Sequence, residues 1–215
     1  MLLPAAREAI VTTCRELSRA GLMVGTAGNV TVRDGELVAV TPSGVRYDGL
    51  TPELVGVHRL DGTPVEAPLA PTSELPLHLA VYAARPEAAA VVHTHSPAAT
   101  ALSALADEVP SVHYYVAMFG GPVPVARYAT YGTGELARNA VDALRDRTAC
   151  LLSNHGAVVV GPDLGTAQDK SVYLEWLCDV YLRAASAGTP RLLSAADLAA
   201  VTEKLAGYGQ QPPAV

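Results

Sequence analysis

Charged side chains are scarce in this sequence, and no stretch of it is strongly basic. Asp, Glu, Lys and Arg together make up 17% of its 215 residues, and the formal net charge is −6. Proteins that bind nucleic acid usually carry a concentrated Lys/Arg face, so no nucleic-acid partner is expected. A phosphate ligand would have to be held by local hydrogen-bond donors. The weakly polar surface also indicates contacts between subunits.

Long apolar runs and a cysteine framework are lacking as well. No apolar stretch approaches the ~18 residues of a membrane-spanning helix, and the first residues lack the basic segment and apolar core of a signal peptide. The cysteines, Cys14, Cys150 and Cys178, are far apart and odd in number, which disfavours a disulfide framework or a zinc knuckle. We expect a protein of the reducing cytoplasm with no membrane partner.

What the sequence does contain is a succession of short strands and helices. Hydrophobic residues make up 50% of it, and this length fits a single α/β domain over 1–215. Hairpins are expected around Asp34-Gly35 and Asp61-Gly62, and the residues 209–215 read as a flexible tail. Further strands are expected over 89–95, 150–154 and 157–160, and helices over 4–20, 75–84, 96–105, 133–145, 164–187 and 194–208. The hairpins favour a mainly antiparallel sheet with helices on its faces.

The segment His93-Thr94-His95 is the pattern most typical of a metal site. On a strand, alternate side chains point to the same face, so both imidazoles could reach one cation. Catalytic zinc usually takes three protein ligands, and His155 is the preferred third because it precedes a glycine turn at a strand end. A strand histidine can also be an ordinary core or surface residue. Spacing alone leaves three alternatives for the third ligand: His58, His78 and His113.

Glu74 comes at the entrance of a predicted helix, in Pro71-Thr72-Ser73-Glu74. Thr72 or Ser73 could simply cap that helix, with the carboxylate complementing its dipole. Alternatively, Glu74 is a general acid/base beside the metal, and the hydroxyl and helix N–H groups hold an anion. Two further polar segments that contain glycine, 25–29 and 41–44, are either plain turns or backbone nests for a phosphate.

Taken in order along the chain, these segments resemble the class II aldolase/adducin family. The shared pattern comprises Gly25-Thr26-Ala27-Gly28-Asn29-Val30-Thr31-Val32-Arg33, Thr41-Pro42-Ser43-Gly44, Pro71-Thr72-Ser73-Glu74, His93-Thr94-His95, His113-Tyr114, Asn154-His155-Gly156 and Tyr208-Gly209. It extends from about Arg7 to Gly209 with similar spacing throughout. The resemblance implies a three-layer α/β fold, in which helices flank a mainly antiparallel sheet. It also implies a homotetramer with active sites at the subunit interfaces.

The resemblance further implies roles for the metal and phosphate residues. His93, His95 and His155 would bind one zinc ion or another divalent transition metal. Glu74 would be the acid/base, and it can approach the metal when substrate is absent. The phosphate pocket would be made by Thr26, Asn29, Ser43, Gly44, Thr72 and Ser73. Thr72 stands where the family usually has Ser, so its extra methyl group is expected to reshape that pocket slightly.

Two tyrosines complete the site that the resemblance implies. Tyr114 would reach in from the neighbouring subunit and protonate the carbonyl oxygen of the aldehyde. Tyr115 follows it directly, so the choice between them depends on the preceding His113. Tyr208 would lie where the family's mobile tail covers the site. The segment 116–119 departs from the family pattern, and a change there could alter substrate preference.

The reaction implied is retro-aldol cleavage of a ketose 1-phosphate, such as fuculose 1-phosphate, to dihydroxyacetone phosphate and a small aldehyde such as lactaldehyde. The metal would serve as Lewis acid, and the phosphate loops would orient the substrate. Two rivals keep the fold, a sugar-phosphate 4-epimerase and a methylthioribulose-phosphate dehydratase; the epimerases usually show Asp-Thr where this chain has Glu74. A non-catalytic, adducin-like assembly module would lack the metal ligands. A zinc hydrolase would carry motifs that this sequence does not have.

Overall fold

A single sheet of nine strands organises the computed structural model, which describes residues 1–205. The strands are β1 (Asn29–Asp34), β2 (Leu37–Val40), β3 (Gly56–Arg59), β4 (Pro64–Glu66), β5 (Ala90–Thr94), β6 (Glu108–Val109), β7 (Val123–Ala126), β8 (Ala149–Leu152) and β9 (Gly156–Gly161). They lie in the order β4-β3-β2-β1-β5-β9-β8-β7-β6. Every neighbouring pair is antiparallel except β7 and β8. The expected mainly antiparallel α/β architecture is confirmed.

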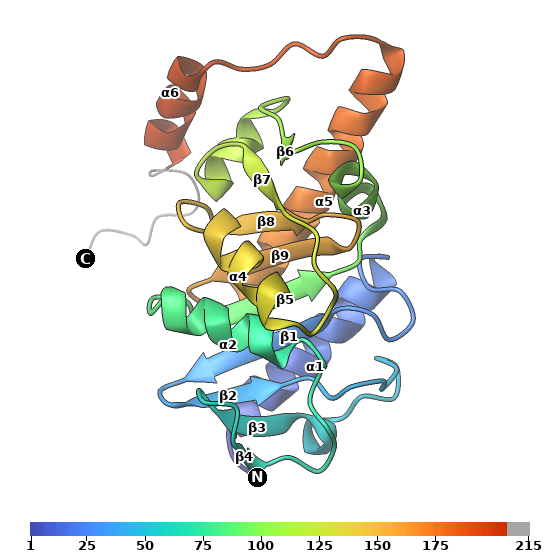
Figure 1. Ribbon diagram of the computed structural model, residues 1–215, viewed down its shortest axis with the longest axis vertical. Helices are drawn as coiled ribbons and strands as arrows, with labels where there is room; N and C mark the ends of the chain where they lie inside the picture. Colours follow the sequence, from blue (N-terminus) through green and yellow to red (C-terminus); the bar gives the residue numbers. More distant parts are fainter. Residues whose placement is uncertain (206–215) are drawn as a thin grey trace, which may run out of the picture.

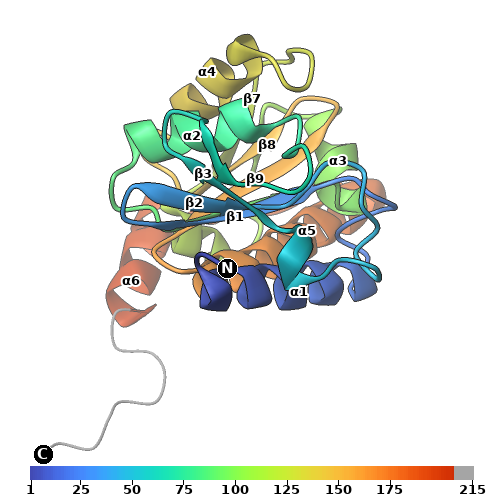
Figure 2. The same ribbon diagram turned by 90° about the horizontal axis from the view of Figure 1, so that it is seen from below.

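Helices cover both faces of this sheet and give the three layers. They are α1 (Pro4–Arg19), α2 (Leu75–Ala84), α3 (Pro97–Ser103), α4 (Gly134–Ala143), α5 (Leu164–Ala187) and α6 (Ala195–Leu205), with short 3-10 helices η1 (Pro52–Leu54) and η2 (Tyr114–Phe119). Figure 1 shows the strands following one another along the long axis of the molecule. Figure 2 shows α2 and α4 on one face of the sheet and α1 and α5 on the other. Among the helices over 1–205, none combines the length and apolar character of a bilayer-spanning segment.

Alternating residues of the central strands supply two separate apolar layers. Val92 of β5 is fully buried in the cluster that contains Ile10 of α1 and Leu177 of α5. Its neighbour Val91 is fully buried in the other cluster, with Val81 of α2. Strand side chains alternate between faces, so one continuous apolar run can fill both layers, as strands covered on both faces require.

Local sequence signals locate most of the elements correctly. Both predicted hairpins form, between β1 and β2 and between β3 and β4. The hydroxyl of Thr133 accepts a hydrogen bond from the backbone N–H of Leu136 and caps α4. Ser194 and Asp197 bond each other reciprocally before α6, as a capping box does. The predicted end of α6, near residue 208, lies outside the described residues.

Three short elements escaped the sequence patterns, namely β6, β7 and η2. β6 has two residues, which is too short to show alternation, and β7 contains Pro124. Proline within a run argues against a strand unless the strand lies near a sheet edge. Here β7 is the last strand but one. The tertiary sheet therefore recruits segments whose own sequence does not specify a strand.

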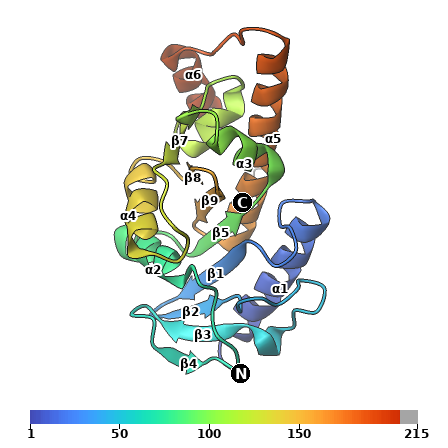
Figure 3. The same cartoon turned by 45° about the vertical axis from the view of Figure 1, so that its right-hand side comes forward.

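The central three strands, β1, β5 and β9, bring distant segments to one end of the sheet. Asn29 at the start of β1 is paired with His93 of β5. Thr94 of β5 is paired with Ala157 of β9, so the turn that joins β8 to β9 lies beside the end of β5. Asn154 in that turn has a φ of 56°, in the left-handed region that asparagine tolerates better than most residues. Figure 3 shows these strands between the two helical layers.

Any side chain at Gly156 is expected to destabilise the contact between the start of β9 and the end of β5. A Cβ atom there would overlap the carbonyl oxygen of Thr94, which is backbone and cannot turn away. We expect Gly156→Ala to lower the free energy of unfolding by about 1–3 kcal/mol, as measured by denaturant unfolding. Gly49→Ala is the matched control, because its Cβ would come no closer than 3.7 Å to another atom. Equal midpoints for the two variants would contradict the packing described here.

Candidate metal centre

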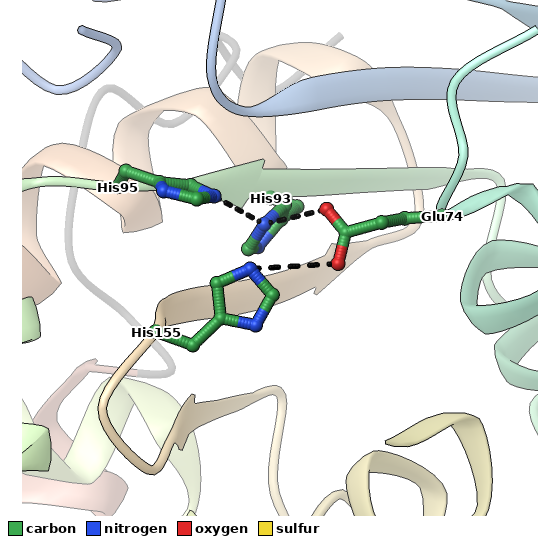
Figure 4. Close-up of side chains that lie close together, drawn as sticks. All are labelled: Glu74, His93, His95 and His155. Carbon is green, nitrogen blue, oxygen red and sulfur yellow. Dashed lines mark hydrogen bonds and ion pairs between the residues drawn. The ribbon is translucent and has the colours of Figure 1, made fainter. Parts of the chain in front are cut away.

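Three histidines and one glutamate converge at the end of the central strands. Figure 4 shows the four side chains pointing toward one another. One ligand atom from each of Glu74, His93, His95 and His155 lies within 4.8 Å of the others. His93 and His95 leave β5 on the same side, as strand alternation predicts, and their Nε2 atoms are 2.9 Å apart. The turn between β8 and β9 supplies His155.

The three alternative histidines lie elsewhere. His58 is buried on β3, where its Nδ1 atom contacts the carbonyl oxygen of Gly62. The ring of His113 packs edge-on against Trp176, with ring centroids 4.8 Å apart. His78 is buried on α2 and forms hydrogen bonds with Asn29 and Thr31. Of the sequence candidates, the structure therefore groups only His155 with the His93–His95 pair.

Burial disfavours the charged form of two of the imidazoles in the cluster, His95 and His155. The Nδ1–H of His93 donates to the carbonyl oxygen of Ala157 at 2.9 Å, which orients the ring so that Nε2 faces the other ligand atoms. Burial, with the neighbouring His93 and His155, lowers the pKa of His95 to about 4. Burial and His93 likewise lower the pKa of His155. Neutral imidazole is the form that binds metal ions.

Glu74 presents two unlike oxygens to the cluster. Burial acts to raise the pKa of this carboxyl, but His93, Asn29 and His155 outweigh it and hold the pKa below its usual value. Its Oε2 atom lies 2.9 Å from Nε2 of His93 and accepts a hydrogen bond from Nδ2 of Asn29 at 3.0 Å. Its Oε1 atom is buried without a hydrogen-bond partner among the described residues, 3.5 Å from Nε2 of His155. One oxygen is thus anchored and the other is free.

This donor set fits a divalent cation. Ligand atoms ~2.0–2.1 Å from a tetrahedral zinc stand roughly 3.3 Å apart, and the closest donor pairs here are separated by 2.9 and 3.5 Å. A cation would also satisfy the unpartnered Oε1 of Glu74, which is costly to bury alone. Three imidazole nitrogens and a carboxylate suit zinc and several other transition metals.

A cavity of about 440 Å³ opens beside the cluster. Glu74, His95 and His155 form part of its wall. The rest includes all six residues that the family resemblance assigned to a phosphate pocket: Thr26, Asn29, Ser43, Gly44, Thr72 and Ser73. Within the described residues, its lining contains no Lys or Arg. An anion here would therefore be held by hydroxyl and N–H donors next to a cation.

Backbone hydrogen bonds join the loops that form this cavity. The N–H of Ser43 donates to the carbonyl oxygen of Ala70, and the N–H of Thr72 donates to that of Thr41. The buried Tyr47 hydroxyl donates to the carbonyl oxygen of Gly28 at 2.5 Å and so holds the first glycine loop. No sequence motif marked Tyr47, because only the folded loop brings it under Gly28.

At the entrance of α2, neither Thr72 nor Ser73 is the N-cap residue, so the plain helix-cap alternative is wrong. Glu74 itself precedes the first helical residue, and no side chain caps the helix from that position. The hydroxyl of Thr72 instead accepts a hydrogen bond from the N–H of Glu74 at 3.3 Å. Ser73 is exposed toward the cavity. The turn before α2 therefore aims Glu74 at the histidines, while Ser73 stays available to a ligand.

The cavity also has a wall that the sequence did not predict. Tyr128, Tyr131 and Asn154 line it, and the two tyrosines are 63% and 65% exposed. Their loop packs closely on the α2 entrance, because a Cβ on Gly132 would come within 2.9 Å of the carbonyl oxygen of Ser73. The two tyrosines are distant in sequence from the other motifs, and only the tertiary structure places them here, whereas Asn154 directly precedes His155.

Among the predicted site residues that the structure describes, Tyr114 and the buried His93 are not part of the lining of this cavity. Tyr114 lies in η2, is 42% exposed, and its ring is 4.2 Å from that of His113. It lines a separate apolar cavity together with Tyr115, Met118 and Val201. Tyr208 lies outside the described residues. The role of either tyrosine remains a prediction.

Comparisons with known proteins agree with this fold. The pattern of the Class II Aldolase and Adducin N-terminal domain matches residues 8–182. A 5-deoxy-D-ribulose 1-phosphate aldolase of Bacillus thuringiensis is 38% identical over 98% of this chain and 100% of its own length. An L-fuculose phosphate aldolase of Escherichia coli is 40% identical over 93% of this chain and 94% of its own. A solved L-fuculose 1-phosphate aldolase structure superposes with a TM-score of 0.91 at 34% identity, covering 94% of this chain and 96% of its own. The chain belongs to the class II aldolase and adducin family.

Proposed function

We propose that this protein is a metal-dependent lyase that cleaves a ketose 1-phosphate to dihydroxyacetone phosphate and a small aldehyde. The observation that carries the proposal is the group of Glu74 and three histidines in the wall of a cavity rich in hydroxyl and N–H donors. Relatives named as aldolases for L-fuculose phosphate and 5-deoxyribulose 1-phosphate support it. Both sugars are ketose phosphates that end in a methyl group.

His93, His95 and His155 would hold the metal, which we propose to be one zinc ion per subunit. A bound divalent cation would supply Lewis-acid stabilisation for the negative charge that carbon–carbon cleavage leaves on the phosphate-bearing half. Neutral imidazole ligands leave the charge of the cation largely intact, which suits that task. The intact ligand set argues against an adducin-like assembly module.

Glu74 would carry the proton of the reacting carbon. In cleavage, the C3–C4 bond of the ketose breaks, the C4 hydroxyl loses its proton as the aldehyde forms, and C3 gains a proton. Because Asn29 anchors Oε2, we assign that proton transfer to Oε1. In the reverse direction the same oxygen would remove the proton from dihydroxyacetone phosphate. A carboxylate at hydrogen-bonding reach of a carbon acid is a usual general base.

The phosphate group would bind in the loops that carry Thr26, Ser43, Gly44, Thr72 and Ser73. Gly44 has a φ of 71°, so its loop adopts the left-handed backbone that anion nests use. Binding energy from this remote group would hold the reacting bond in register with Glu74. Asn29 borders the same pocket, but its amide is already engaged with Glu74 and His78.

Tyr114 would complete the site from a neighbouring copy of the chain. It does not line the cavity of its own subunit. It is 42% exposed and packs on His113, whose ring contacts the equally exposed Trp176. We therefore propose a homotetramer in which Tyr114 of one subunit exchanges a proton with the aldehyde oxygen in the next. In cleavage its phenolate would accept the proton of the C4 hydroxyl and become the phenol, and in synthesis the phenol would return that proton.

The experiment that tests the proposal is product detection on a panel of ketose 1-phosphates with zinc-loaded protein. The panel includes L-fuculose, L-rhamnulose, L-ribulose and 5-deoxyribulose 1-phosphates, and the unphosphorylated sugars serve as the comparison. We expect release of dihydroxyacetone phosphate from one phosphorylated member and its loss after treatment with EDTA. Conversion to an epimer or loss of water without aldehyde release would assign the site to a 4-epimerase or a dehydratase instead.

A further inference from the structure

A stripe of polar residues on α2 faces a stripe of polar residues on β1 beneath the metal cluster. Glu74, His78 and Tyr82 are spaced four residues apart, and Asn29 and Thr31 are spaced two apart. Four helical residues rise by about 6 Å, and two strand residues by about 6.7 Å. The spacing between successive side chains is therefore nearly the same in the two stripes. Side chains of the helix can alternate with side chains of the strand along the whole length of the stripes.

These five side chains form an unbroken chain of hydrogen bonds. Glu74 Oε2 contacts Asn29 Nδ2 at 3.0 Å, and Asn29 Oδ1 contacts Nε2 of His78 at 2.5 Å. The other ring nitrogen of His78, Nδ1, lies 2.8 Å from Oγ1 of Thr31. Thr31 Oγ1 in turn lies 2.9 Å from the hydroxyl of Tyr82. Each link alternates between helix and strand.

The direction of every bond follows from the carboxylate at one end. Glu74 only accepts, so Asn29 must turn its NH₂ group toward it and its Oδ1 toward His78. His78 must then donate from Nε2 and accept at Nδ1, which fixes one tautomer of its ring. Thr31 donates to that Nδ1, and Tyr82 donates to Thr31. All four donors point toward Glu74.

Burial prevents water from reversing the direction of these hydrogen bonds. Relative exposures are 5% for Glu74, 4% for Asn29, 0% for His78 and Thr31, and 2% for Tyr82. Water cannot replace a missing partner at such depth, so each group depends on the next. Burial also lowers the pKa of His78 to about 3, which agrees with a neutral ring that donates from a single nitrogen.

We propose that His78 is a positioning residue that fixes the orientation of the Asn29 amide. The fixed amide holds Oε2 of Glu74, so that Oε1 is presented to the metal cluster and the substrate cavity. This inference rests on the acid/base role proposed for Glu74. It assigns to His78 no contact with substrate or metal. Without the His78 ring, Asn29 can rotate its amide. Glu74 then loses the hydrogen bond from Asn29 Nδ2 to Oε2, which is what makes its two oxygens different.

Four variants separate this role from simple packing. His78→Phe keeps an aromatic ring but removes both bonds, and His78→Gln keeps a donor near the position of Nε2. His78→Asn is the matched control, since its shorter amide reaches the position of Nδ1 and not that of Nε2. Tyr82→Phe removes only the far end of the chain. We expect kcat on the substrate found by the panel to fall about 10- to 100-fold for Phe and Asn, the range seen for residues that orient site ligands.

The same measurements should show a fall in kcat without a matching change in KM or in metal content. KM is expected to stay within a few-fold of wild type, because the phosphate donors are untouched, and metal content after dialysis is expected to stay at the wild-type level. His78→Gln should recover most of kcat, and Tyr82→Phe should lose little. A folded His78→Phe protein with wild-type kcat, or equal losses for Gln and Asn, would overturn the proposal.

A spectroscopic readout is independent of turnover and of variant folding. Nitrogen-15 NMR of the wild-type protein should show His78 as the neutral Nε2–H tautomer, in both metal-free and zinc-loaded samples. A protonated ring or the Nδ1–H tautomer would overturn the proposal even if every variant failed to fold. If the wild type cleaves no panel member, the proposed function fails on that result alone. In that case the NMR result alone tests whether His78 positions Asn29: the neutral Nε2–H tautomer of His78 supports it, and any other form contradicts it.

Discussion

A His95→Ala protein is expected to lose its metal and its aldol cleavage together. His95 is one of three imidazoles whose nitrogens converge within 4.8 Å with an oxygen of Glu74. Loss of a residue that merely orients a metal ligand costs 10- to 100-fold in affinity or activity, so loss of a ligand should weaken binding by more than about 100-fold. Metal content per chain after dialysis and the rate of dihydroxyacetone phosphate release are the two measurements.

The matched control for that substitution is His113→Ala, scored for metal content alone. The ring of His113 lies among Tyr114, Tyr115 and Trp176, outside the cluster, so this variant should keep its metal. The thermal unfolding temperatures of both proteins report whether each has folded. A folded His95→Ala protein that retains metal with wild-type affinity would show that the cation binds elsewhere.

Glu74→Gln is expected to lower kcat by about 10²- to 10⁴-fold, the usual contribution of a general acid/base. The amide keeps the shape of the carboxylate and can still accept the hydrogen bond of Asn29, but it cannot take up a proton at the position of Oε1. The variant should also fail to exchange the C3 hydrogen of dihydroxyacetone phosphate with deuterated solvent. Exchange followed by NMR needs no aldehyde, so it isolates the proton transfer from the rest of the reaction.

The control for this prediction is Glu8→Gln, which makes the same chemical change at an exposed position of α1. It should keep both the cleavage rate and the exchange rate of wild type. Metal content must be measured on both variants, because Glu74 also lies 2.9 Å from Nε2 of His93. If Glu74→Gln keeps its metal and still exchanges the C3 hydrogen at the wild-type rate, another group must move that proton.

Only part of the candidate site was visible in the sequence. The loops with Thr26 and Ser43 carry glycine and hydroxyl side chains, the loop with Thr72 carries two adjacent hydroxyl side chains, and all three loops reach the cavity. Tyr128 and Tyr131 carry no such signal, because they come from a loop that only the packing of Gly132 against Ser73 brings close. Exposed tyrosines in a loop look alike in sequence whether or not they border a site.

His78 illustrates the same limit at a buried position. Its spacing of four residues from Glu74 places both on one face of α2, which the sequence shows. The partner stripe of Asn29 and Thr31 is distant in the chain, and its pairing with α2 depends on the neighbouring positions of β1 and β5. The sequence therefore indicates a possible neighbour of Glu74 but contains no sign of the direction of its hydrogen bonds.

The sequence by itself determined most of the local elements and the His93–His95 pair. Strand alternation, hairpin turns and helix caps involve residues a few positions apart, so the geometry of the backbone fixes them directly. The tertiary structure decided which histidine joins that pair, how Asn29 is oriented and which tyrosines wall the cavity. Those choices depend on the strand order β1-β5-β9, which brings together residues more than sixty positions apart, such as His93 and Ala157. Local spacing carries no information about contacts at that range.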